Sequence, residues 1–292
     1  MIMILAAMIA GAAAEARAAP APDDEAIVIQ GTRPSEHQVR DFIRALTSVP
    51  SFGQIGRFHD AVCPVAMGLP QSQNEQIAQR MRQVAAVAKI KVAPAKCTPN
   101  AFVIVAPDKA AAIRDLEKRF PVYLSQMTAR QVRELTASPE PAAAWQVKRL
   151  LTSDGLEATK AAGHDYYTVK SADNPSHIKA NSKPTFTASV VVIDVKAAAG
   201  LTPIQLADYA AMRTFADMAP ARVKAVDVPT ILGAVGAPDD KPVPVTLTYW
   251  DLGFLKSLYS TDNSYLANYQ RGDMEQVLSN TVESSDNEPA PK

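Results

Sequence analysis

The feature that most constrains the fold of this chain is the almost continuous apolar run VVVIDV at residues 190–195. A strand with one face in water alternates apolar and polar residues, and this run does not alternate. It therefore predicts a strand that is buried on both faces. A second apolar run, from Phe102 to Val105, predicts another buried strand.

Helical patterns fill much of the remaining chain. Apolar residues recur at three- and four-residue steps in three segments. They are Val39, Phe42, Ile43 and Leu46; Ile77, Met81, Val84 and Ala88; and Ile113, Leu116 and Phe120. Capping boxes predict that helices begin at Ser72, Thr128 and Thr202, and Thr248 with Asp251 predicts the start of a last helix.

This alternation of strands and helices predicts an α+β fold with a mixed sheet and packed helices. We expect an N-terminal lobe of alternating strands and helices over residues 25–136, and a C-terminal strand-and-helix lobe over residues 145–278. Residues 136–144 are rich in Pro, Ala and Ser, which predicts a linker between the lobes. A disordered tail is predicted over residues 279–292.

The first 14 residues are apolar, which is too short for a membrane span of about 20 residues. Small residues and an Ala-x-Ala-like site follow, so residues 1–19 are predicted to be a signal peptide. No Lys or Arg precedes the apolar run, and a buried N-terminal helix is the alternative. We expect a periplasmic or secreted protein with no transmembrane span in the mature chain.

The chain has two cysteines, Cys63 and Cys97. In an oxidising compartment they are expected to form a disulfide, with two buried free thiols as the alternative. Neither has a second Cys or a His at ligand spacing, except that His59 lies four residues before Cys63. A zinc site needs three or four ligands, so no metal site is predicted here.

Charge and motifs argue against several functions. Thirty basic residues balance thirty acidic ones, which gives no global field that would favour nucleic acid. No Gly-x-Ser-x-Gly elbow, Walker loop or Gly-x-Gly-x-x-Gly occurs, so no cofactor is predicted.

The C-terminal half resembles, in layout, the active-site half of zincin metallopeptidases of the metzincin and matrixin kind, and also secreted bacterial proteins with that layout. The strand TASVVVIDV is followed by the helix LADYAAMRTFADM at residues 206–218, the turn PTIL and the last helix LTYWDLGFLKSLY. The resemblance covers residues 185–260 and implies a strand, a His-Glu-x-x-His helix, a turn and a final helix.

The zinc-binding residues of those peptidases are missing. The family's helix carries two histidines four residues apart, which hold the metal, and a glutamate that takes a proton from its water. The corresponding positions here are Asp208, Tyr209 and Met212. Tyrosine is a poor base near pH 7 and methionine is too soft a ligand for hydrolytic zinc. The resemblance therefore implies a catalytically inactive relative, and packing in the core is the alternative role for these side chains.

Two functions follow from these observations. The first is a non-enzymatic binding module with an unknown envelope protein or ligand as its partner. The second is a metal-dependent hydrolase with a histidine-based site, built from His59 or from a pair of His164 and His177 with nearby carboxylates.

Overall fold

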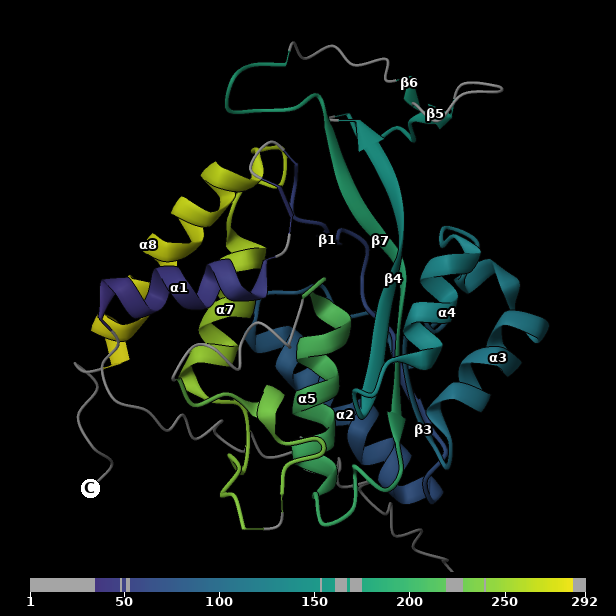
Figure 1. Cartoon of the computed structure of the whole chain (residues 1–292). Coiled ribbons are helices and arrows are strands. Elements are labelled where there is room, and N and C mark those ends of the chain that lie inside the picture. The colour runs from purple at the N-terminus through teal and green to yellow at the C-terminus, as the bar shows by residue number, and fades with distance from the viewer. Residues whose placement is uncertain are drawn as a thin grey trace, which may run out of the picture.

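A computed structural model describes residues 35–47, 49–50, 53–152, 154–160, 167–168, 175–218, 228–238 and 240–285. The protein has an α+β fold built around a mixed sheet with packed helices (Figure 1). The predicted signal peptide, residues 1–19, lies outside the described residues.

The sheet has five strands, and its longest strand, β7, lies in the middle. The strands are β1 (Arg57–Phe58), β2 (Pro64–Met67), β3 (Ala101–Ala106), β4 (Ala142–Thr152) and β7 (Ser182–Asp194). On one side β7 pairs in parallel with β3 and, nearer its start, with β1. On the other side it pairs antiparallel with β4, and β2 extends the sheet beyond β3. A separate two-stranded sheet joins β5 (Thr159–Lys160) and β6 (Tyr167–Thr168).

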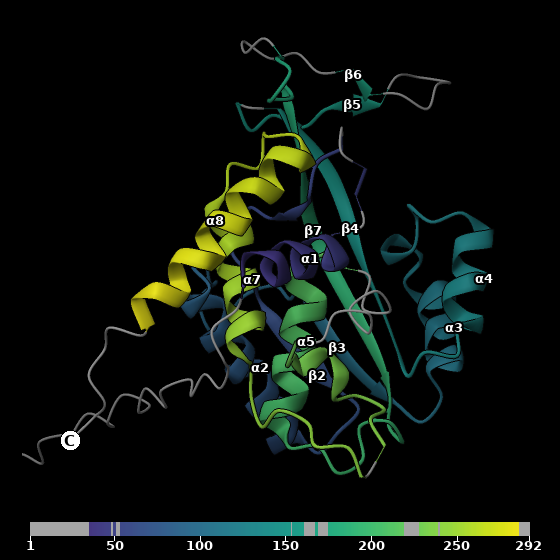
Figure 2. The same ribbon diagram turned by 60° about the vertical axis from the view of Figure 1, so that its left-hand side comes forward.

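Helices cover both faces of this sheet, as the two views show (Figures 1 and 2). One face carries α3 (Lys109–Arg119), the 3₁₀ turn η1 (Pro121–Tyr123) and α4 (Ala129–Ala137). The other carries α1 (Glu36–Leu46), α2 (Gln71–Val87), α5 (Pro203–Phe215), the 3₁₀ turn η2 (Ile231–Gly233), α7 (Tyr249–Ser260) and α8 (Ala267–Ser285).

The buried strand predicted from VVVIDV is confirmed. Val191 and Ile193 belong to the larger apolar cluster, whereas Val190 and Val192 belong to the smaller one beneath α3 and α4. Because side chains alternate along a strand, the run has no polar face. Val195 follows the end of β7 and is 37% exposed.

Most predicted helix starts are confirmed. Thr128, Thr202 and Thr248 each accept a hydrogen bond from the backbone N–H three residues on, and the side chain at that position bonds back. The box at Ser72 is wrong, because α2 begins at Gln71 with Pro70 as its N-cap. Asn74 instead bonds the backbone of Leu69, and the N-cap of α2 lies two residues earlier than predicted.

The predicted apolar helix faces are buried in α1 and α2. In α3, Ile113 is buried and Leu116 packs partly buried against the smaller cluster. Phe120 is 47% exposed, contrary to the prediction, because α3 ends at Arg119 and Phe120 leaves the helix periodicity.

The two predicted lobes share one hydrogen-bonded sheet, because β3 from residues 25–136 pairs directly with β7 from residues 145–278. The predicted linker, residues 136–144, contributes its first residues to α4 and its last to β4, where Ala142 and Ala143 are buried.

The predicted disordered tail, residues 279–292, begins inside a helix, since α8 continues to Ser285. Ala267, Met274 and Leu278 of α8 are fully buried against the core. Within the described part of the chain, no helix combines the length and apolarity needed to cross a membrane.

Candidate functional site

Helix α5 occupies the place where the resemblance would put a metal-binding helix. It follows β7 and packs against α2, and every residue from 205 to 215 is buried. Its capping box and the proline at its first turn set where it begins. The helix α5 therefore lies in the protein interior, where its buried polar side chains need hydrogen-bond partners.

Asp208, the first of the three positions that the resemblance aligns with zinc-site residues, is fully buried and bound to α2. Its Oδ1 lies 2.8 Å from Nε of Arg80, and its Oδ2 accepts from Nη2 of Arg80 at 3.2 Å. Oδ2 also accepts from Oγ1 of Thr246 and from the backbone N–H of Leu247. This carboxylate is therefore neutralised by a guanidinium and hydrogen-bonded through both oxygens.

Tyr209, the second position, is paired with Arg213 one helical turn later. Its hydroxyl accepts a hydrogen bond from Nη1 of Arg213 at 2.6 Å, and the guanidinium lies over its ring. Burial raises the pKa of Tyr209, and the nearby guanidinium only partly offsets this. The phenol is therefore neutral near pH 7 and unsuited to act as a base.

Met212, the third position, has no exposed surface and belongs to the larger apolar cluster. The structure thus gives the three positions different surroundings: an ion pair, a phenol–guanidinium contact and apolar packing. In the part of the chain that the structure describes, no three His, Cys, Asp or Glu residues form a group that could hold a metal ion.

Asp251 joins the turn η2 to helix α7. Its carboxylate accepts hydrogen bonds from the hydroxyls of Thr230 and Thr248 and from the backbone N–H groups of Ile231 and Thr248. Burial raises the pKa of Asp251, and these four hydrogen bonds counter the shift. Asp251 thus links the segment PTIL to the helix α7 by hydrogen bonds. These are the two segments that follow α5 in the resemblance.

Of the histidines proposed for a hydrolytic site, the structure describes His59 and His177. His59 is largely exposed, and partial desolvation of its ring, followed by the charges of Lys183 and Lys91, lowers its pKa. The neighbouring Asp60 lies 2.6 Å from Nη2 of Arg149. His177 is exposed, and His164 lies outside the described residues.

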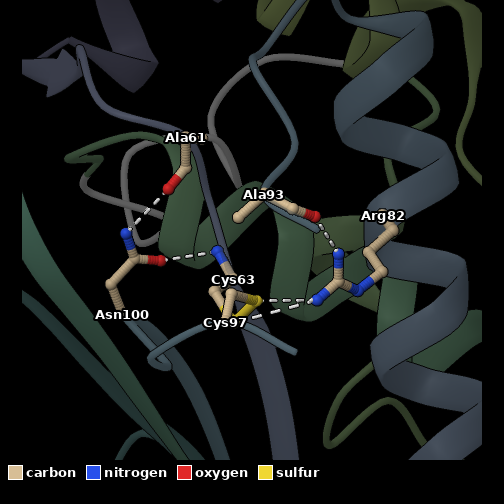
Figure 3. Close-up of a disulfide and its surroundings, with 6 residues drawn as sticks. All are labelled: Ala61, Cys63, Arg82, Ala93, Cys97 and Asn100. Carbon is tan, nitrogen blue, oxygen red and sulfur yellow. Dashed lines mark hydrogen bonds between the residues drawn. A yellow bond between two sulfur atoms is a disulfide. The ribbon is translucent and has the colours of Figure 1, made fainter. Parts of the chain in front are cut away.

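The predicted disulfide between Cys63 and Cys97 is confirmed. It joins residues 34 apart in sequence with their Cα atoms 6.1 Å apart, so neither cysteine is a free thiol. Arg82 of α2 points at the two sulfurs (Figure 3).

Sequence reasoning missed Arg80, Arg82 and Arg213, which contact Asp208, the disulfide and Tyr209. Arg213 stands four residues after Tyr209, a spacing at which helical side chains meet, so this pair could have been found. Arg80 and Arg82 contact groups brought near only by the packing of α2, for which the sequence holds no local signal.

Comparison with known proteins identifies no relative of this chain. The chain matches no protein-family model, no curated protein and no solved structure.

Proposed function

We propose that this chain is an exported, non-enzymatic binding module of the cell envelope that has the layout of a degenerate zincin. Its partner would be another envelope protein or ligand, bound through surfaces other than α5. The single observation that carries the proposal is the burial of the three degenerate positions in the core.

The environment of Asp208 is the strongest part of this argument. A hydrolytic zinc needs ligand lone pairs that point toward an open coordination position. Both oxygens of Asp208 are instead used by Arg80, Thr246 and Leu247. A cation placed at this carboxylate would also meet the positive charge of Arg80.

The order of elements supports the zincin-like layout. β7, α5, η2 and α7 follow one another as the strand, helix, turn and final helix of the resemblance. Asp251 ties the turn to the final helix, which gives the acidic residue of the Leu-Thr-x-x-Asp pattern a structural role here.

The disulfide supports export, because disulfides persist in oxidising compartments and are rare in a reducing cytosol. The cleavage and location of the chain are testable directly, by fractionation of the producing cells and by the mass of the mature N-terminus.

The decisive experiment measures metal content and hydrolysis together. Protein purified without chelators is analysed for transition metals and assayed on casein and on a mixed peptide library. We expect far less than one metal ion per chain, and no cleavage that a chelator abolishes. Stoichiometric zinc, or chelator-sensitive cleavage lost in H59A, would overturn the proposal in favour of a histidine-based hydrolase.

A further inference from the structure

The disulfide has a cation directly beside both sulfurs. Nη2 of Arg82 lies 3.0 Å from Sγ of Cys97 and 3.8 Å from Sγ of Cys63 (Figure 3). Nη1 of the same guanidinium donates to the carbonyl oxygen of Ala93 at 2.6 Å, which holds it in this position. A disulfide carries no charge, so this contact is weak while the bond is intact and strong once a sulfur becomes a thiolate.

The two sulfurs differ in access. Cys63 is 4% exposed and directly precedes the edge strand β2, whereas Cys97 is only partly buried and lies in the loop that leads to β3. Thiol–disulfide exchange needs the attacking thiolate to reach a sulfur. Cys97 is therefore the sulfur that an external thiolate meets.

We propose that Cys63–Cys97 is an exchangeable disulfide, attacked at Cys97 by an external dithiol, with Arg82 stabilising the thiolates that form. This inference does not depend on the proposed binding function. The partner is a dithiol of the kind carried by thiol–disulfide oxidoreductases, which is identified here by its chemistry alone.

The exchange is balanced in two steps. A thiolate of the dithiol attacks Sγ of Cys97, so that the Cys63–Cys97 bond breaks, a mixed disulfide forms and Cys63 leaves as a thiolate beside Arg82. The second thiolate of the partner then attacks the partner's first sulfur, which is bonded to Cys97 in the mixed disulfide, and Cys97 is released as a thiolate. The protein disulfide gains two electrons, the dithiol loses two and becomes a disulfide, and the two protons of the dithiol pass to solvent or to the new thiolates.

The surrounding structure is built to remain in place when the bond opens. Asn100 accepts a hydrogen bond from the backbone N–H of Cys63 at 2.7 Å and donates to the carbonyl of Ala61 at 3.0 Å. The backbone N–H of Asn100 also donates to the carbonyl of Cys63. These hydrogen bonds connect the residues just before β2 with those just before β3, and they do not depend on the disulfide. Reduction of the disulfide therefore need not unfold the sheet.

The first test is a redox titration of the whole chain against reduced and oxidised glutathione. R82Q removes the charge, R82K keeps a cation, and R119Q removes an exposed guanidinium elsewhere. We expect R82Q to require an about tenfold more reducing glutathione ratio for half-reduction. R82K should shift less, and R119Q should match the wild type. An R82Q midpoint within twofold of the wild type would overturn the role of Arg82.

The second test does not depend on the stability of the disulfide. In C63S, Cys97 remains as a single thiol beside Arg82, and its alkylation by iodoacetamide is followed against pH. We expect the alkylation of C63S to begin at lower pH than that of C63S/R82Q, because the guanidinium favours the thiolate. Identical pH profiles would contradict the proposal, even if R82Q is less stable.

The third test identifies the attacked sulfur. Brief reaction of the wild-type chain with glutathione, followed by acid quenching and peptide mass analysis, should find glutathione on Cys97. In the single-thiol variants, C63S should form the mixed disulfide with oxidised glutathione readily and C97S slowly. Glutathione found mainly on Cys63 would overturn the proposed direction of attack.

Discussion

Arg80 of α2 and Asp208 of α5 form a buried ion pair, with Nε of the arginine 2.8 Å from Oδ1 of the aspartate. The two residues are 128 positions apart in sequence and are almost completely buried. In the alignment that the resemblance implies, Asp208 takes the place of the first zinc-binding histidine. In this protein that position holds two helices together.

Breaking this pair from one side should be strongly destabilising. In D208N the guanidinium of Arg80 stays buried without an anion, and we expect a loss of about 3–5 kcal/mol in the free energy of unfolding. Urea unfolding measures it. The double variant R80M/D208L should recover much of the loss, because neither charge remains.

The exposed pair Arg119–Asp115 is the matched control for this measurement. D115N should change the unfolding free energy by less than about 0.5 kcal/mol, since exposed pairs four apart on a helix contribute little. A D208N variant as stable as D115N would show that Asp208 is not a structural anchor.

Met212 gives a second test of the core role of α5. M212A leaves a cavity at a position with no exposed surface, and we expect it to lose about 2–5 kcal/mol. Ile204 lies on the same helix but is 39% exposed, so I204A should lose less than about 1 kcal/mol. Equal losses in urea unfolding would indicate that Met212 lines an open space.

Local signals in the sequence predicted the parts of the fold that local interactions determine. The boxes at Thr128 and Thr202 involve side chains three residues apart, and both formed. The capping box at Ser72 did not form, because the side chain of Asn74 instead hydrogen-bonds the backbone of Leu69 in the preceding turn.

Features set by tertiary packing could not be predicted in this way. Among residues 267–280 of helix α8, whose side chains the structure describes, only Ala267, Met274 and Leu278 are fully buried apolar residues, and the sequence analysis predicted no helix there. The partner of Asp208 depends on how α2 packs on α5, which no spacing in the sequence encodes. The helix that carries Asp208, Tyr209 and Met212 was therefore predictable, but not the surroundings of these side chains.

Asp251 allows two capping boxes to be compared at different depths. In the wild type four donors bind the carboxylate of Asp251. In D251N only one acceptor oxygen remains for them, and we expect a loss of about 2–4 kcal/mol in the free energy of unfolding. Gln131 occupies the equivalent position in the exposed box of α4, and Q131A should lose less than about 1 kcal/mol. Chemical unfolding of both variants checks the contrast, and similar losses would contradict the joining role of Asp251.

Reduction of the disulfide should lower the thermal stability while leaving the fold intact. A bond between residues 34 apart contributes about 4 kcal/mol in the chain-entropy account, or roughly 8 °C in the melting temperature of a chain this size. Calorimetry with and without reductant measures the shift, and C63A/C97A should match the reduced wild type. A reduced protein that melts at the same temperature as the oxidised one would contradict this expectation.

His59 should titrate below the ordinary histidine pKa of about 6.5. Its pKa is lowered first by partial desolvation of the ring and then by the charges of Lys183, Lys91 and Arg57, while Asp60 acts in the opposite direction. Between its folded pKa and about 6.5 the unfolded chain binds more protons at this site. The unfolding free energy should therefore rise as the pH rises through that window, and only slightly because the side chain is exposed. NMR titration of the wild type and K183Q checks this: loss of the lysine charge should raise the pKa of His59. A histidine that titrates above 6.5 in the wild type, or a lower pKa in K183Q, would show that His59 does not lie in this positively charged environment.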